Sequence, residues 1–155
     1  MLLAWAFSSL LLPAPIQTWL DREQPGWTLA PVAPQIESWF RETNFPYSPN
    51  LIAADFDSDG RIDYAIHILV RKEARLIVFR ATAEGFTPQL LATHSPDRFT
   101  FLILYRKGDK DFDFIAGKPF RYAHNSIGLL YDNRTARTFQ WNGRRFSGRD
   151  APGDE

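Results

Sequence analysis

The sequence predicts an α+β fold that is mainly antiparallel β-sheet built from hairpins, with a short amphipathic helix near the N-terminus. Three observations favour this class. Apolar residues recur with a period of two along residues 62–70, the spacing of a strand. Turn-forming residues separate further short apolar runs, most clearly at Asn142-Gly143. Ile36, Trp39 and Phe40 recur at helical spacing, with polar residues between them.

Composition sets the scale of the domain. The chain has 155 residues, of which 45% are hydrophobic and 15% aromatic, so it can bury one core and form one domain. Its 18 basic and 18 acidic side chains balance, and we therefore expect no nucleic-acid partner. The absence of cysteine excludes disulfides, thiolate metal sites, thiol nucleophiles and a lipid-modified cysteine. Stability is expected to come from packing, with help from a metal where one binds.

Residues 1–18 have the pattern of a secretory signal peptide. An apolar run broken only by Ser8 and Ser9 precedes Pro13-Ala14-Pro15, and its length suits a signal peptide better than a bilayer span. We therefore expect a secreted or periplasmic protein with no membrane span in its mature form. No Lys or Arg precedes the apolar run, so a short buried N-terminal helix is the alternative.

The next segment contains the predicted helix. Residues 19–33 include Pro25-Gly26 and Pro31, which predict an irregular lead-in to a single β-rich domain at 34–148. Pro34 can occupy the first turn of a helix over residues 34–43, which ends before Pro46. Its apolar stripe is expected to face the core.

From residue 51 onward we expect strands and hairpins. In the strand 62–70, Tyr64 and its even-numbered neighbours share one face, whereas Asp63 and His67 lie on the other. A hydrogen bond of His67 near Asp63 is therefore one expected contact. Polar turns are expected at 71–73 and 83–85. The further strand candidates are residues 76–79, 86–93, 99–105, 127–131 and 135–141.

A C-terminal hairpin is expected around Asn142-Gly143. This dipeptide predicts a two-residue type I′ turn, because both positions need positive φ and Asn-Gly tolerates it best. Counting outward places Trp141 opposite Arg144 and Phe139 opposite Phe146. Residues 149–155 are polar and are expected to form a flexible tail.

The segment 55–63 carries the strongest chemical signal. Four aspartates occupy relative positions 1, 3, 5 and 9, and Gly60 occupies position 6. Ca²⁺ takes six to eight oxygen ligands, and carboxylates at alternate positions can converge on one ion when a glycine permits the sharp turn. Without a cation the four charges would repel one another. The pattern predicts a Ca²⁺ site, and its alternative is an Asx-rich turn with solvated acids. The predicted metal ligands are Asp55, Asp57, Asp59, Asp63 and the carbonyl oxygen of Arg61.

Position 12 of this loop distinguishes it from an EF-hand. An EF-hand has a bidentate Glu there, whereas this chain has Ile66 on the expected buried face of a strand. The equatorial ligands are left to Asp63, water or a distant residue. We therefore expect an affinity in the weaker, extracellular range, on the order of 10⁻⁴ to 10⁻³ M.

Residues 54–66, which read Ala-Asp-Phe-Asp-Ser-Asp-Gly-Arg-Ile-Asp-Tyr-Ala-Ile, resemble the calcium loop of FG-GAP and VCBS-type repeats. In that family the repeats form propeller blades on exported or cell-surface proteins, and the resemblance implies the same ligand set. One loop in a domain of this size cannot build a propeller, so only the loop is carried over. Residues 138–146 also resemble the closing hairpin of uncharacterised exported bacterial proteins with this kind of loop.

Other candidate sites are weaker. Asp109, Asp111 and Asp113 could line one face of a strand, but no glycine follows to turn the chain, which favours a solvated face. The three histidines lack the short spacings typical of zinc sites. No nucleophile elbow or phosphate-binding glycine loop is present, and Asp57 with Asp59 fits ligands better than a glycosidase pair. Three tryptophans could form a binding platform but are expected mostly in the core: Trp27, Trp39 and Trp141.

These patterns predict an exported, non-catalytic domain with a structural Ca²⁺ loop, acting as an interaction or structural module. Its partner, beyond Ca²⁺, would be a protein or a glycan. The alternative is an exported small enzyme or enzyme inhibitor that uses the acidic loop and exposed aromatics to contact its target.

Overall fold

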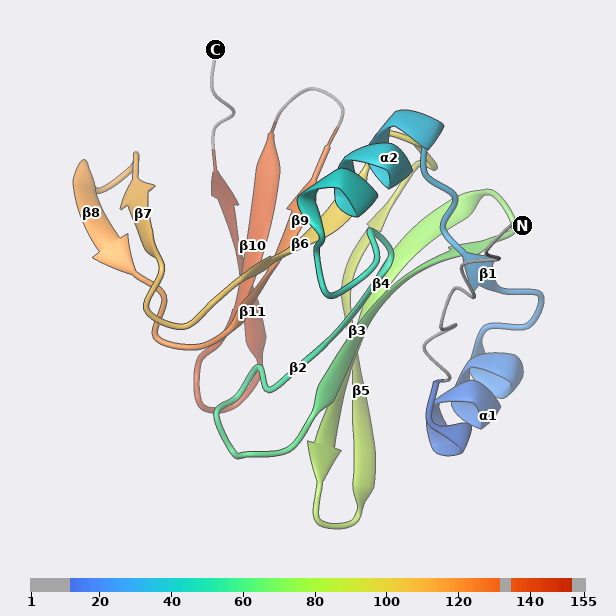
Figure 1. Ribbon diagram of the computed structural model, residues 1–155. Coiled ribbons are helices and arrows are strands. Elements are labelled where there is room, and N and C mark those ends of the chain that lie inside the picture. Colours follow the sequence, from blue (N-terminus) through green and yellow to red (C-terminus); the bar gives the residue numbers. More distant parts are fainter. Residues whose placement is uncertain (1–11, 132–134, 152–155) are drawn as a thin grey trace, which may run out of the picture.

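The computed structural model describes residues 12–131 and 135–151, which contain two helices and eleven strands (Figure 1). The helices are α1 (Ala14–Glu23) and α2 (Pro34–Thr43). The strands are β1 (Thr28–Leu29), β2 (Leu51–Ala54), β3 (Asp63–Val70), β4 (Glu73–Thr82), β5 (Gly85–His94), β6 (Phe101–Tyr105), β7 (Lys110–Asp113), β8 (Lys118–Arg121), β9 (Ser126–Leu130), β10 (Ala136–Trp141) and β11 (Phe146–Ala151). The strands pair antiparallel, which confirms the predicted fold class.

Two larger sheets face each other, and a small hairpin stands apart from them (Figure 1). The first sheet has the order β1-β3-β4-β5, and β2 also pairs with β3. The second has the order β11-β10-β9-β6, while β7 and β8 form the separate hairpin. The two sheets meet near β2 and β6, where the backbone N–H of Leu102 donates to the carbonyl of Pro49 at 2.7 Å. The two sheets therefore form a sandwich, and this backbone hydrogen bond joins them at one edge.

The main core lies between the two sheets. Alternation along each strand turns every second side chain inward, as Ala65 of β3 and Leu129 of β9 illustrate. The buried members of this core are Ile52, Ala54, Phe56, Ala65, Leu76, Val78, Ala92, Leu102, Ile127, Leu129, Phe139 and Phe146. Phe56 belongs to the acidic segment, so one residue of the candidate loop is anchored in the core.

A second core lies on the opposite face of the first sheet, beneath α1. Ile16 and Leu20 are fully buried there, and the ring of Trp19 contacts that of Phe79 edge to face at 5.2 Å. Residues 19–23 are therefore helical rather than irregular, and residues 28–29 form β1. The sequence obscured this helix because Pro13 at its N-cap makes no side-chain capping bond and its apolar residues continue a longer apolar run.

The predicted signal peptide lies largely outside the described residues, which begin at 12. Residues 14–18 form the first half of α1. Within the described part of the chain, no helix is long and apolar enough to cross a membrane.

Helix α2 has the predicted bounds of 34–43. Pro34 occupies its first turn, and Asn44 ends it in the left-handed conformation with φ 56°. Phe40 is buried and contacts the ring of Phe101 on β6 at 5.8 Å. Phe40 thus faces the body of the protein as expected, whereas Trp39 of the same stripe is 41% exposed.

The C-terminal hairpin has a different register from the predicted one. Trp141 pairs with Phe146, and Phe139 pairs with Gly148, so the connection has four residues instead of two. The side-chain oxygen of Asn142 accepts the backbone N–H groups of Arg144 and Arg145, both at 3.0 Å. This side chain closes a wider turn, in which positive φ falls only on Gly143.

Strand β11 also extends beyond the predicted end of the domain. Residues 149–151 continue the pairing with β10, and Arg137 lies opposite Asp150 with a salt bridge of 3.2 Å. The tail prediction was therefore wrong for 149–151, because strand pairing holds a polar segment that its composition suggested would be free. Residues 152–155 lie outside the described part.

Candidate metal site in the acidic loop

The acidic loop connects β2 to β3 and is closed by their pairing. Ala54 lies opposite Asp63 in the ladder, so the two ends of the loop are neighbours. Ser58 and Gly60 have positive φ angles of 61° and 86°, which reverse the chain between them. The glycine at position 6 therefore has the role that the sequence predicted for it.

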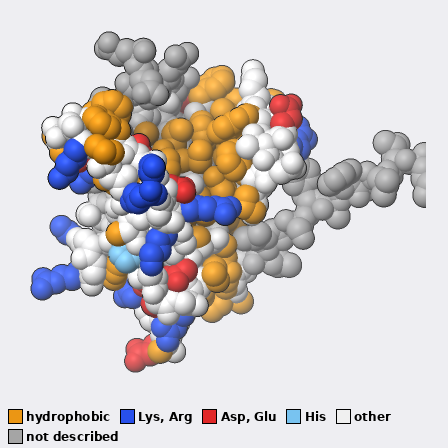
Figure 2. All heavy atoms as spheres, turned by 60° about the vertical axis from the view of Figure 1, so that its left-hand side comes forward, with side chains coloured by type: hydrophobic (Ala, Val, Ile, Leu, Met, Phe, Trp, Pro, Cys, Tyr) orange, Lys and Arg blue, Asp and Glu red, His pale blue; other side chains and the backbone are white. Residues whose placement is uncertain are grey.

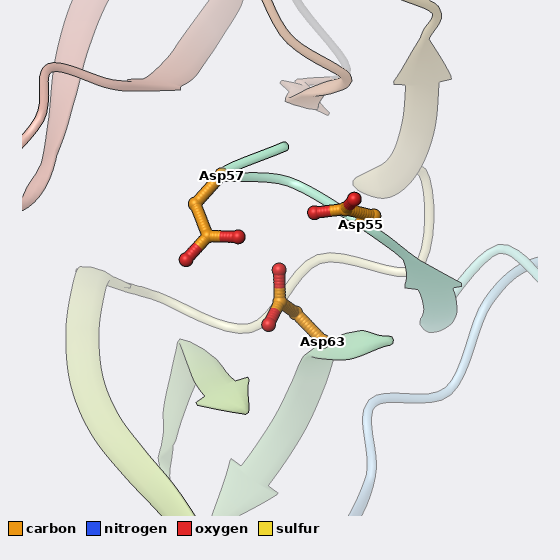
Figure 3. Close-up of side chains that lie close together, drawn as sticks. All are labelled: Asp55, Asp57 and Asp63. Atoms are coloured by element: carbon orange, nitrogen blue, oxygen red, sulfur yellow. The ribbon is translucent and has the colours of Figure 1, made fainter. Parts of the chain in front are cut away.

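Three of the four aspartates converge. Asp55, Asp57 and Asp63 each offer a carboxylate oxygen, and these oxygens lie within 4.8 Å of one another. Figure 3 shows the three carboxylates turned toward a common space, two from the loop and one from the start of β3. Within the described residues, this is the one group of three or more His, Cys, Asp or Glu side chains with such geometry.

Asp63 anchors the loop to the sheet. Its side chain is fully buried, and its two oxygens accept the backbone N–H groups of Phe56 and Ala81, each at 2.8 Å. Burial raises the pKa of Asp63 to about 6, and the charges of Asp57 and Asp59 also raise it, although the two backbone hydrogen bonds act in the opposite direction. One carboxylate thus joins the loop, β3 and the end of β4.

Asp55 orders the turn from within. Its two oxygens accept the backbone N–H groups of Asp59 at 3.1 Å and Gly60 at 2.8 Å. Asp57 also accepts the N–H of Asp59, at 3.2 Å. Backbone donors therefore hold two carboxylates in the loop at fixed positions, as a preorganised cation site requires.

An arginine from β4 balances part of the negative charge. The guanidinium of Arg80 lies 3.4 Å from Asp57 and stacks over the ring of Trp141 at 4.8 Å. Burial, followed by the charge of Asp59, raises the pKa of Asp57. This carboxylate is therefore held in an environment where a cation would stabilise its charged form.

Asp59 lies outside the converging group. It accepts the backbone N–H of Arg61 at 2.8 Å and pairs with the Arg61 guanidinium at 3.0 Å. The hydrogen bond from the Arg61 backbone is the main cause of its lowered pKa. Asp59 and the carbonyl oxygen of Arg61 remain predicted metal ligands. To bind a metal, the Asp59 carboxylate would have to break its salt bridge with Arg61.

Two residues from a distant segment contact the loop and were missed from the sequence. The side-chain amide of Asn125 donates to the carbonyl of Asp55 at 2.9 Å, and the Ser58 hydroxyl lies 2.7 Å from Nδ1 of His124. Asn125 also accepts the backbone N–H of Lys107 at 3.0 Å. Asn125 and His124 lie more than sixty positions along the chain from the loop residues that they contact, and no sequence motif marks either of them.

The structure brings two of the three histidines together. Nε2 of His67 lies 2.9 Å from Nε2 of His94, and the two rings stack. The expected contact of His67 near Asp63 is thus replaced by a contact with His94 on β5. Within the described residues, no third metal-ligating side chain joins this pair in a cluster.

The other weak candidates are occupied by local contacts. Asp113 pairs with Arg149 at 2.8 Å, and Asp111 accepts the hydroxyl of Tyr122, so the alternating acids of 109–113 form no cluster in the described residues. The three tryptophans do not share one platform. Trp27 packs on the core beneath α1, Trp39 contacts Phe40 and Phe45, and Trp141 packs on the inter-sheet core.

No protein-family model, curated protein or solved structure matches the chain. Its function therefore has to be inferred from the loop and its surroundings.

Proposed function

We propose that this chain is an exported, non-catalytic domain in which Ca²⁺ binds the 55–63 loop and fixes the start of β3. The rest of its surface would then act as an interaction or structural module for a protein or glycan partner. The convergence of Asp55, Asp57 and Asp63 carries the proposal. The spacing of the aspartates and Gly60, which is similar to that of FG-GAP and VCBS calcium loops, supports it.

The ligand set suits a hard cation. Three carboxylates supply oxygen ligands, and each carboxylate oxygen that accepts one N–H keeps a further lone pair for a metal. Asp59 would leave Arg61 to add a fourth carboxylate, and the Arg61 carbonyl and water would complete the six to eight ligands of Ca²⁺. The cation would take over the part of the charge balance that Arg80 now provides at Asp57.

The surroundings of the loop favour a structural role. Among the residues that the structure describes, the groups that contact its carboxylates are backbone N–H donors and two arginines, Arg61 and Arg80. Such a set stabilises a fixed loop. A nucleophile does lie beside a base at this loop, since the Ser58 hydroxyl is 2.7 Å from Nδ1 of His124. Within the described residues, however, no carboxylate is hydrogen-bonded to His124 to orient its ring, as catalysis by such a pair requires. Extracellular calcium concentrations match the weak affinity expected for this ligand set, which is consistent with export.

The test is a thermal and chemical unfolding series with and without Ca²⁺. For a dissociation constant of 10⁻⁴ to 10⁻³ M, 10 mM Ca²⁺ should raise the free energy of unfolding by about 1.4 to 2.7 kcal/mol. Asp57→Asn and Asp59→Asn should each lose most of this gain, because each removes one anionic ligand. Isothermal titration calorimetry with CaCl₂ gives the affinity directly.

The matched control is Glu84→Ala, which removes one carboxylate from the exposed β4–β5 turn. It should keep the full calcium response. An equal calcium response in the wild type and in both aspartate variants would disprove the site, because a general salt effect does not depend on these side chains.

A second candidate function follows from Arg80. A guanidinium already lies beside Asp57, so the same loop could receive a cationic side chain of a target protein, as expected of an enzyme inhibitor. Divalent dependence separates the two proposals. Target binding that persists in EDTA and is lost in Asp57→Asn favours this alternative.

A further inference from the structure

The hairpin of β7 and β8, residues 110–121, pairs with neither of the two larger sheets and projects from them as an arm, which contacts β11 through Asp113 and Arg149 (Figure 1). Its turn reads Phe114-Ile115-Ala116-Gly117 and contains no polar side chain. Ile115 is 81% exposed and Phe114 is 57% exposed. Neighbouring large apolar side chains with this exposure are typical of a surface that binds a protein or a membrane, because their contact with water is unfavourable.

The apolar tip is continuous with one face of the arm. Phe112 is 42% exposed and its ring contacts that of Phe114 at 5.0 Å, edge to face. Phe112 lies opposite Pro119 in the ladder, so the proline shares this face. Figure 2, which looks onto this side of the molecule, shows hydrophobic side chains gathered on the surface with lysine and arginine side chains beside them.

Strand alternation places two of the three cations of the arm on one face and both acids, with Lys118 opposite Asp113, on the other. Lys110 pairs with Arg121 in the ladder, which places both cations on the face of Phe112. Within the described residues neither of them forms a salt bridge, and Arg121 donates to the carbonyl of Gly108.

The two acids lie on the other face. Asp113 pairs with Arg149 of β11, and Asp111 accepts the hydroxyl of Tyr122. The negative charges of the arm are therefore neutralised or hydrogen-bonded on the opposite face, and the apolar face keeps its positive charges.

An apolar wedge flanked by cations is complementary to an anionic lipid surface. The apolar side chains can enter the boundary between headgroups and acyl chains, while the cations stay at the level of the phosphates. Each Lys or Arg near such a surface strengthens binding. We propose that the tip of the β7–β8 arm inserts into the interfacial region of anionic bilayers. This proposal does not depend on the calcium site.

Flotation with lipid vesicles tests the proposal, and all samples contain EDTA so that no divalent ion bridges the protein to lipid. The wild type should float with vesicles of phosphatidylcholine and phosphatidylglycerol and stay unbound with phosphatidylcholine alone. The double variant Phe114→Ser/Ile115→Ser should bind roughly tenfold more weakly, because it removes the inserting side chains. Lys110→Glu/Arg121→Glu should bind roughly tenfold more weakly as well. All four side chains are exposed, so folding is preserved, which circular dichroism checks.

Leu90→Ser and Lys72→Glu are the matched controls, since they change an apolar side chain 55% exposed on β5 and an exposed cation in the β3–β4 turn. Both should bind like the wild type. The chain has no cysteine, so Ile115→Cys can carry a single environment-sensitive dye, with Leu90→Cys as its control. Emission should shift to the blue at 115 and stay unchanged at 90 when anionic vesicles are added.

Three results would overturn the proposal. They are equal binding to neutral and anionic vesicles, undiminished binding of the tip variant, and a blue shift at position 115 that appears on self-association without lipid. The last would assign the tip to a contact between copies of this chain.

Discussion

The side-chain amide of Gln89 on β5 pairs with the backbone of Phe146 on β11. Its Nε2 donates to the Phe146 carbonyl at 2.9 Å, and its Oε1 accepts the Phe146 N–H at 3.0 Å. One side chain thus supplies both hydrogen bonds that a neighbouring strand would otherwise make. It joins the outer strands of the two sheets at the side where Phe146 enters the core.

Gln89→Ala should destabilise the domain by about 1–3 kcal/mol, because it leaves a partly buried N–H and carbonyl without partners. Urea denaturation measures the loss. Gln35→Ala, in the exposed first turn of α2, is the control and should change stability by less than about 0.5 kcal/mol. Equal losses of stability in the two variants would mean that the hydrogen bonds between Gln89 and Phe146 do not stabilise the fold.

In the absence of calcium, replacing Asp63 and replacing Asp57 by asparagine should have different effects on the free energy of unfolding. Asp63 accepts an N–H on each of its two oxygens, and an asparagine side chain at this position would turn its own NH₂ group toward one of those donors. In EDTA, Asp63→Asn should therefore lose about 1–3 kcal/mol of stability. Asp57→Asn should match or slightly exceed the wild type, because it removes a carboxylate whose raised pKa shows that its charge is disfavoured.

Chemical denaturation of both variants in EDTA measures the difference. A large loss in Asp57→Asn would show that its pair with Arg80 outweighs the repulsion among the carboxylates. A negligible loss in Asp63→Asn would remove its assigned role as the anchor of the loop.

His67 should make stability depend on pH. It is 1% exposed, and burial followed by the proximity of His94 lowers its pKa to about 4. His94 Nδ1–H donates to the carbonyl of Ser95, so neutral His94 presents Nε2 as an acceptor for His67 Nε2–H. His67 Nδ1 is then a buried acceptor without a partner among the described residues, which favours the neutral ring.

The unfolded chain binds a proton at this residue near pH 6.5 and the folded chain only near pH 4. The stabilisation by His67 is therefore complete above pH 6.5 and is lost progressively as the pH falls toward 4. Asp63 acts in the opposite sense over part of this window, since its folded pKa of about 6 exceeds its ordinary value. Comparing the wild type with His67→Gln isolates the histidine. Between pH 7.5 and pH 5 the wild type should lose roughly 2 kcal/mol more than the variant. Parallel pH profiles would refute the assignment.

The sequence predicted those elements whose signals are local. Alternation identified β3, turn residues identified the β3–β4–β5 hairpins, and Pro34 with the apolar spacing gave α2 its bounds. The loop was predicted because one short segment supplies both its carboxylates and its glycine. Each of these features is decided within about ten residues of chain.

The features that the sequence did not reveal depend on contacts between distant segments. Arg80 and Asn125 reach the loop from β4 and from the segment before β9, and no local pattern distinguishes them from other polar residues. The pairing of His67 with His94 depends on the register between β4 and its two neighbours. The hairpin register was mispredicted because the Asn142 side chain stabilises a four-residue turn, which competes with the two-residue turn favoured by Asn-Gly.

Gly128 is expected to determine the position of the Tyr105 ring, which stacks on Tyr122 at the base of the β7–β8 arm. It lies in the middle of β9, and a Cβ atom there would come 2.5 Å from Cε2 of Tyr105 and 2.7 Å from Cγ2 of Ile103. The Tyr105 ring thus occupies the space above the glycine and stacks on Tyr122 at 4.9 Å, nearly parallel to it. Tyr122 in turn donates to Asp111 of β7, so this stack connects the central strand of the sheet to the arm.

Gly128→Ala should destabilise the domain by about 1–3 kcal/mol, because the methyl group forces the Tyr105 ring and the Ile103 side chain from their positions. In a double-mutant cycle the cost should fall when Tyr105 is already alanine, since one of the two clashes is then absent. Chemical denaturation of the four proteins supplies the coupling energy. A coupling of zero would mean that the ring moves aside without cost and that the glycine does not determine its position. A positive coupling would show that a residue without a side chain fixes the aromatic stack on which the arm rests.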